Sequence, residues 1–222
     1  MHRFFTEPSR VHETVIEIGG PDVNHIKNVL RMKPGEEVEI SDGAGTEYLC
    51  EIDRYEEEAV ILRILSSAGE PAELPSKIYL FQGLPKGDKM ELIIQKAVEL
   101  GVSQIVPVRM ERCVSRPDGK ASQKKTDRWQ KIAVEAAKQC GRGILPQVCP
   151  PADFHQALIQ AAQAEVFLFC YEGGGESVSR LITQQTKNVS VLLGPDGGFS
   201  LPEAEAARTA EIGRAPCRAR GE

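Results

Sequence analysis

Hydrophobic and polar residues alternate along much of the first 65 residues, which is the period of strands that bury one face. This alternation predicts four strands, over residues 14–18, 38–40, 48–52 and 60–64. The run Asp42-Gly43-Ala44-Gly45 has the composition of a hairpin turn. Apolar residues at helical spacing predict a short helix over 22–30. Short strands, tight turns and one helix together predict a small β-barrel.

From Lys77 onward, apolar strand patterns alternate with helical stripes. Strands are predicted over 77–82, 102–108, 166–170 and 189–193. Helices are predicted over 89–100, 129–140, 154–162 and 177–185, and another is expected after Ser200. Asp88 and Ser200 are expected N-caps, with Glu91 and Glu203 at the reciprocal capping-box positions. This order predicts an α/β segment with a mostly parallel sheet.

A stretch with the composition of a linker, Ser66–Pro75, separates the two patterns. We therefore predict a barrel domain over 1–70, a linker over 71–76 and an α/β domain over 77–222. The length of 222 residues fits one large domain or two small ones.

The composition is that of an ordinary globular protein, with 41% hydrophobic and 27% charged residues, and it excludes disorder as the dominant state. No apolar run is long enough to span a bilayer, and the first residues lack the pattern of a signal peptide. We therefore expect a cytoplasmic protein with no membrane partner.

The formal net charge of −5 hides a basic segment. Between Arg109 and Arg142 there are ten Lys and Arg residues against four Asp and Glu residues. A basic region in an acidic protein is a candidate surface for RNA phosphates. A solvated helix face next to a lysine-rich loop explains the charges equally well, so both interpretations stay open.

Cysteine and histidine spacing argues against a metal site. The six cysteines form no Cys-x-x-Cys pair, and the four histidines show no spacing typical of metal ligands. Reduced and mostly buried thiols are expected, with a catalytic thiol as the less favoured alternative.

Two predicted strands are followed by glycine-rich turns, Gly173-Gly174-Gly175 and Gly194-Pro195-Asp196-Gly197-Gly198. Ligands of open α/β sheets bind beyond the carboxyl ends of strands, where glycine lets the backbone approach closely. Neither turn is a dinucleotide fingerprint or a P-loop. A purely structural role for both turns remains the alternative.

Several motifs occur in order along the chain: His2-Arg3-Phe4-Phe5, residues 25–32, residues 86–91, residues 94–102, Glu111-Arg112-Cys113, residues 129–142 and residues 193–200. In these motifs the chain resembles the RsmE family, the SPOUT methyltransferases that modify N3 of a uridine in 16S ribosomal RNA. The resemblance covers residues 1 to about 212. Asp196 stands where the family usually has glutamate, which keeps a carboxylate there.

The resemblance implies a PUA-like RNA-binding barrel followed by a SPOUT α/β domain with a deep trefoil knot. It also implies S-adenosylmethionine as methyl donor, 16S rRNA in the small ribosomal subunit as substrate, a homodimer and no metal. The donor pocket would be lined by Phe169, Tyr171, Leu193, Gly194, Gly197 and Gly198. Candidate catalytic residues near the uracil or its phosphates are Arg112, Glu135, Gln139 and Arg142.

Candidate RNA contacts from the barrel are Arg3, His25, Lys27 and Arg31, because basic groups position phosphates. One or two of these four are expected to serve packing instead. Each catalytic candidate has the alternative of being a surface side chain or a partner in an intrahelical pair.

The resemblance ends after Ile212. Residues 213–222 carry no apolar period, whereas the family continues through a strand and a loop into a final helix. This tail looks like an altered reading frame or a gene-end error. We therefore expect an incomplete knot, a doubtful homodimer and poor donor binding. The alternatives to an active methyltransferase are a non-catalytic RNA-binding protein and a nucleotide-binding enzyme, although the latter lacks a P-loop lysine.

Overall fold

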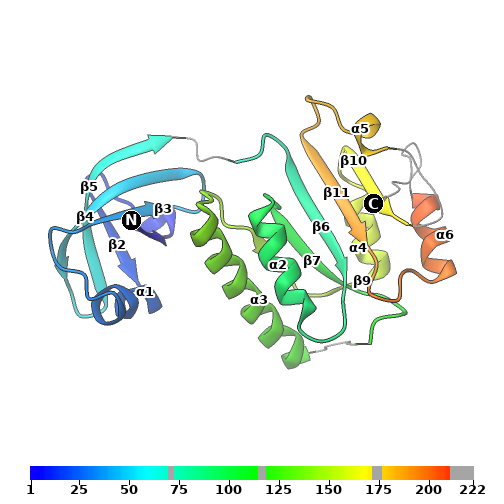
Figure 1. Ribbon diagram of the computed structural model, residues 1–222, viewed down its shortest axis with the longest axis horizontal. Helices are drawn as coiled ribbons and strands as arrows, with labels where there is room; N and C mark the ends of the chain where they lie inside the picture. The colour runs from blue at the N-terminus through cyan, green and yellow to red at the C-terminus, as the bar shows by residue number, and fades with distance from the viewer. Residues whose placement is uncertain (70–72, 115–118, 172–176, 211–222) are drawn as a thin grey trace. The chain divides into compact units, whose positions relative to one another are not determined.

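The computed structural model describes residues 1–69, 73–114, 119–171 and 177–210. They form two compact units (Figure 1). The N-terminal unit contains Met1–Glu73 together with Ala137–Leu145, and the C-terminal unit contains Leu74–Ala136 and the chain from Pro146 onward. The division at Glu73 falls inside the linker proposed from sequence, but the membership of Ala137–Leu145 was not foreseen.

One mixed five-stranded sheet forms the N-terminal unit, in the order β1-β3-β4-β5-β2. Its strands are β1 (His2–Phe5), β2 (Val15–Gly19), β3 (Glu37–Ser41), β4 (Thr46–Tyr55) and β5 (Ala59–Gly69). Strand β1 pairs in parallel with β3, and the other pairs are antiparallel. The alternating residues Ile16, Ile18, Val38, Ile40, Ile52 and Leu62 are fully buried and build its core.

Two features of this sheet differ from the sequence-based expectation. Strand β1 was not predicted, because its four residues are too few to show a period. The linker-like residues 66–69 belong to β5, since the far end of this strand pairs with β4, with Thr46 opposite Gly69. Backbone pairing therefore outweighs local composition here.

The helix predicted over 22–30 is present but changes its hydrogen bonding halfway. A 3-10 turn, η1 (Pro8–Arg10), precedes it, and α1 (Pro21–Asn24) runs directly into a π-helical turn, η2 (His25–Val29). The N–H of Leu30 donates to the carbonyl of His25, five residues earlier, at 2.9 Å. Ile26 is fully buried, whereas Val29 is exposed. Such π turns often occur at functional sites.

The segment Ala137–Leu145 completes the N-terminal unit from a distant part of the chain. The Ser41 hydroxyl donates to the Gly143 carbonyl at 2.8 Å, and the Leu145 N–H donates to the Gly43 carbonyl at 3.3 Å. Lys138 pairs with Asp22 at 3.0 Å. The first two contacts tie the loop around Gly143 to the turn between β3 and β4, and the ion pair ties Lys138 to α1.

The C-terminal unit contains a parallel sheet in the order β10-β11-β6-β7-β8, with β9 also paired to β7. Its strands are β6 (Lys77–Gly83), β7 (Gln104–Arg109), β8 (Gln147–Val148), β9 (Ala152–Asp153), β10 (Val166–Cys170) and β11 (Asn188–Leu193). All its strand pairs are parallel, as expected from the alternation of strands and helices. The two short strands β8 and β9 were not predicted.

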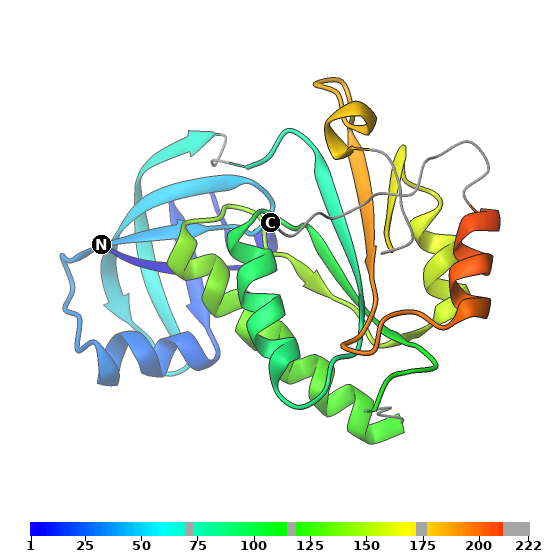
Figure 2. The same cartoon turned by 45° about the vertical axis from the view of Figure 1, so that its right-hand side comes forward.

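Helices cover both faces of this sheet. They are α2 (Lys89–Glu99), α3 (Gly119–Cys140), α4 (Phe154–Ala161), α5 (Val178–Leu181) and α6 (Leu201–Ala210). Figures 1 and 2 show α2 and α3 on one side of the sheet and α4 and α6 on the other. On the α2 side, Arg128 of α3 pairs with Glu91 of α2 at 2.8 Å.

Three helix predictions needed correction. Helix α3 begins at Gly119, ten residues before the apolar stripe that predicted it. Helix α5 ends at Leu181, because Ile182 adopts an extended conformation. Asp88 occupies the N-cap position of α2, but its side chain makes no capping hydrogen bond. Polar and short helices leave weak periodic signals, so their limits depend on tertiary contacts.

Candidate functional site

The two glycine-rich turns leave the sheet at neighbouring strand ends. Strands β10 and β11 pair in parallel, with Cys170 opposite Leu193 at their carboxyl ends. Gly173–Gly175 of the first turn lie outside the described residues. The second turn, hereafter the 194–199 bend, is described throughout and leads directly into α6. This is the edge at which open α/β sheets bind ligands.

An aromatic cluster lies beside the 194–199 bend. The rings of Phe169 and Tyr171 stack at a centroid distance of 5.6 Å, and Phe199 meets the Phe169 ring edge-on at 4.7 Å. Phe169 is fully buried, whereas Tyr171 is half-buried and has the Arg208 guanidinium 5.3 Å from its ring centroid. Tyr171 is therefore the ring of this pair that can contact a ligand, with Phe169 behind it.

Side chains from two other segments fasten the bend. The buried amide of Gln82, at the end of β6, donates to the carbonyl of Gly194 at 3.2 Å. Arg112 donates from Nη1 to the carbonyl of Gly197 at 2.8 Å. Sequence analysis selected Arg112 and missed Gln82. A glutamine at the end of an otherwise apolar strand was the signal that could have identified it.

The glycines of the bend differ in the space around them, since a Cβ added at Gly194 would lie 3.2 Å from both the Gly198 carbonyl carbon and the Phe199 ring. Gly198 has a φ of +67°, which disfavours other residues, and a Cβ added there would meet nothing within 4 Å. Gly197 is exposed, and Leu193 and Gly194 are partly exposed. At Gly198 the backbone therefore has room for a ligand to approach closely.

Asp196 anchors the outer side of the bend. Its carboxylate accepts hydrogen bonds from Lys89 Nζ at 2.7 Å and from the Lys86 N–H at 3.1 Å. The hydrogen bond from Lys89, followed by that from Lys86, lowers the pKa of Asp196 below its ordinary value of 3.8. The ionised form of this carboxylate therefore stabilises the folded state.

We expect Asp196→Asn to lower the melting temperature slightly at neutral pH. Because the folded-state pKa is lowered, this stabilisation is complete above 3.8 and disappears as the pH falls through the lowered value. Thermal unfolding curves at several pH values should show the two proteins converging in acid. A difference that persists unchanged in strong acid would contradict this assignment.

The four candidate catalytic residues divide between the two units. Arg112, at the 194–199 bend, and the exposed Glu135 of α3 belong to the C-terminal unit. Gln139, exposed near the end of α3, and Arg142, in the loop that follows, belong to the N-terminal unit.

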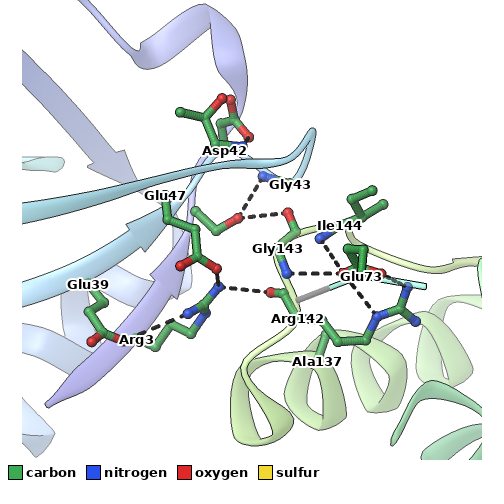
Figure 3. A network of polar contacts seen from close by, with 12 residues as sticks. Arg3, Glu39, Asp42, Gly43, Glu47, Glu73, Ala137, Arg142, Gly143 and Ile144 are labelled. Carbon is green, nitrogen blue, oxygen red and sulfur yellow. Dashed lines mark hydrogen bonds and ion pairs between the residues drawn. The ribbon is translucent and has the colours of Figure 1, made fainter. Parts of the chain in front are cut away.

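Arg142 is held in a buried ion pair (Figure 3). Its Nη2 lies 2.6 Å from Glu73 Oε2, and its Nε donates to Oε1 at 3.2 Å. The N–H groups of Gly143 and Ile144 also donate to Glu73 Oε1, each at 3.1 Å. The Arg142 side chain is only 7% exposed, so its guanidinium stabilises the loop through Glu73.

The RNA-contact candidates also separate into two kinds. Arg3 is mostly buried, pairs with Glu47 and donates to the carbonyl of Arg142 at 3.0 Å (Figure 3). This environment favours the packing role that was expected for one or two of the four. His25, Lys27 and Arg31 are exposed, and Arg31 has a φ of +54°, which is uncommon outside glycine.

A groove of about 960 Å³ opens beside Lys27 in the N-terminal unit. Its basic and amide side chains come from Arg10, Asn24, Lys27 and Asn28, and Glu56–Glu58 border it. The lining therefore mixes two cations with three carboxylates, and the carboxylates weaken its attraction for phosphates.

In the basic segment 109–142, several cations are engaged in ion pairs, including Arg109 with Asp153 at 2.9 Å. Lys120, Lys124 and Lys131 of α3 are exposed.

Within the described ranges, no group of three or more metal-binding side chains occurs. No helix in that part of the chain is long and apolar enough to cross a membrane. Burial raises the pKa of the Cys50 thiol to about 12, which makes it unreactive.

Comparison with known proteins identifies the family. Residues 72–216 match the model of an RNA methyltransferase domain, and residues 18–65 match that of an RNA methyltransferase PUA domain. Ribosomal RNA small subunit methyltransferase E of Bacillus subtilis is 36% identical over 98% of this chain and 88% of its own length. The Aquifex aeolicus protein of the same name is 29% identical over 94% of this chain and 87% of its own length.

Solved structures agree with this result. A ribosomal RNA small subunit methyltransferase E from Neisseria gonorrhoeae, bound to S-adenosyl methionine, superposes with a TM-score of 0.86 at 29% identity, over 100% of this chain and 90% of that one. A putative methyltransferase from Legionella pneumophila, in complex with the same cofactor, gives 0.87 at 29% identity over 99% and 89%. The α/β fold class, the PUA-like domain and the family expected from the motifs are thus confirmed. The chain belongs to the ribosomal RNA small subunit methyltransferase E family.

Proposed function

We propose that this protein transfers a methyl group from S-adenosylmethionine to N3 of a uridine in 16S ribosomal RNA. The observation that carries the proposal is the pair of neighbouring strand ends, one with Phe169 and Tyr171 and the other with the 194–199 bend. S-adenosylmethionine, when bound, supplies an electrophilic methyl group. Family membership supports the same donor, and the open backbone beside Gly198 fits its adenosine part. The tail 213–222, from which poor donor binding and an incomplete knot were expected, lies outside the described residues, and the proposal takes donor binding from the family instead.

The residues of the C-terminal unit would hold the reactants. The backbone of Leu193, Gly194, Gly197 and Gly198 would line the donor pocket, with Tyr171 closing it and Phe169 supporting Tyr171. Arg112 would stand at the pocket edge, where a guanidinium can hold a uracil oxygen or a phosphate. Removal of the uracil N3 proton needs a base within hydrogen-bond reach, and Glu135 is the candidate carboxylate.

The N-terminal unit would bind RNA. Exposed His25, Lys27 and Arg31 supply charge for phosphates, and we infer that Arg3 and Arg142 position the loop that carries Gly143. Gln139 remains a candidate for contact with the target base. A homodimer, which the family resemblance implies although the altered tail made it doubtful, and a cytoplasmic location, expected from the sequence, belong to this proposal.

Methyl transfer to small ribosomal subunits tests the proposal directly. Labelled S-adenosylmethionine should yield 3-methyluridine, identified by mass spectrometry of digested RNA. Arg112→Ala should lower kcat/KM at least about tenfold, equivalent to about 1.4 kcal/mol of transition-state stabilisation. The control Arg109→Ala removes a nearby arginine paired with Asp153 and should stay within about twofold of wild type.

Two results would contradict the proposal. RNA binding without methyl transfer by a donor-binding protein would favour the non-catalytic alternative. Equal losses of kcat/KM in the Arg112→Ala and Arg109→Ala variants would show that Arg112 has no specific role in the site.

A further inference from the structure

One buried carboxylate joins two segments that lie far apart in the sequence. Glu203, in the first turn of α6, is 8% exposed. Its Oε1 accepts the N–H of Glu111 at 2.8 Å, and its Oε2 accepts the N–H of Ser200 at 2.9 Å. Glu111 lies in the turn after β7 that also carries Arg112, and Ser200 directly follows the 194–199 bend.

Helix capping explains only half of this arrangement. In a capping box, the glutamate accepts the N–H of the N-cap residue, which here is Ser200. The return contact, from the Glu203 N–H to Ser200 Oγ, is long at 3.5 Å. The second carboxylate oxygen is directed to Glu111, 92 positions away in the chain. A cap alone has no need for that hydrogen bond.

The same two segments meet again at the surface. Arg112 donates to the Gly197 carbonyl, and a Cβ added at Gly197 would lie 3.4 Å from Arg112 Cβ, in ordinary contact. The Arg112 side chain therefore lies along the bend. Glu203 fixes the backbone on either side of this surface contact, because it binds the residue before Arg112 and the residue after the bend.

We propose that Glu203 is a positioning residue for donor binding. It holds the Glu111–Arg112 turn against the 194–199 bend, so that the glycine backbone is preorganised before the ligand arrives. Preorganisation raises affinity because less ordering is needed on binding. This inference rests on the proposed function, since it concerns the same donor pocket.

Glu203→Gln tests it with little change in shape. The amide nitrogen cannot accept a hydrogen bond, so one of the two N–H groups loses its acceptor. Hydrogen exchange in the ligand-free protein should accelerate at least about tenfold at Glu111 or Ser200. The Kd for S-adenosylmethionine, measured by isothermal titration, should rise at least about tenfold. Glu203→Asp keeps the charge but is too short to reach both groups, and it should weaken donor binding similarly.

The matched control is Ser200→Ala, which removes the hydroxyl of the cap but leaves both hydrogen bonds to the Glu203 carboxylate. Its Kd should remain within about twofold of wild type. Equal weakening in both variants would reduce Glu203 to a helix cap, and unchanged exchange and Kd in Glu203→Gln would overturn the inference. A wild-type protein that binds no donor would contradict the proposed function instead, while hydrogen exchange without ligand still tests the Glu203 contacts.

Discussion

Glu73→Ala should destabilise the N-terminal unit by about 3–5 kcal/mol, the usual cost of removing one partner of a buried ion pair. The substitution leaves the Arg142 guanidinium, whose side chain is 7% exposed, without its carboxylate. It also removes the acceptor of the Gly143 and Ile144 N–H groups. The loop that completes this unit would lose its charge partner and two backbone hydrogen bonds together. Scanning calorimetry and chemical denaturation would measure the loss.

The control for this prediction is an exposed ion pair in the same unit. Glu51→Ala removes the partner of Arg63, whose side chain is 59% exposed, and should cost no more than about 1 kcal/mol. Equal effects of the two substitutions would show that the Glu73–Arg142 pair contributes no more than a surface contact. A glutamine at position 73 should fall between wild type and alanine, because it keeps one acceptor oxygen.

Gly83→Ala should weaken donor binding at least about tenfold, or about 1.4 kcal/mol. Gly83 ends β6, and an added Cβ would lie 2.6 Å from the Pro195 nitrogen and 2.9 Å from the Gly194 carbonyl carbon. These are backbone atoms that cannot rotate away, so the 194–199 bend must shift. Such overpacking costs about 1–3 kcal/mol of stability and disturbs the hydrogen bond from Gln82 to Gly194.

Calorimetric titration with S-adenosylmethionine and a thermal unfolding curve would check this second prediction. Gly197→Ala provides the control for stability, since its added methyl would make only ordinary contact with Arg112 and should leave the melting temperature close to that of wild type. A Gly83→Ala protein with wild-type donor affinity would show that the bend tolerates displacement, and it would weaken the assignment of the pocket.

The sequence determined the features that depend on local pattern. Alternation identified strands such as Val15–Gly19, and an apolar run identified the parallel strand Asn188–Leu193. Glycines and a capping signal located the 194–199 bend and its helix, and the ordered motifs identified the family. These features were accessible because strand alternation, helical stripes and turn residues act over a few neighbouring positions.

Tertiary structure decided which distant residues meet. No local signal indicated that Glu73 would bind Arg142, that Ala137–Leu145 would complete the N-terminal unit, or that Glu203 would reach Glu111. Arg3 was therefore selected for its charge and Arg142 from the family resemblance, although the fold uses both in buried contacts. The free energy of a buried polar group depends on the partner that folding brings to it, and only the assembled chain specifies that partner.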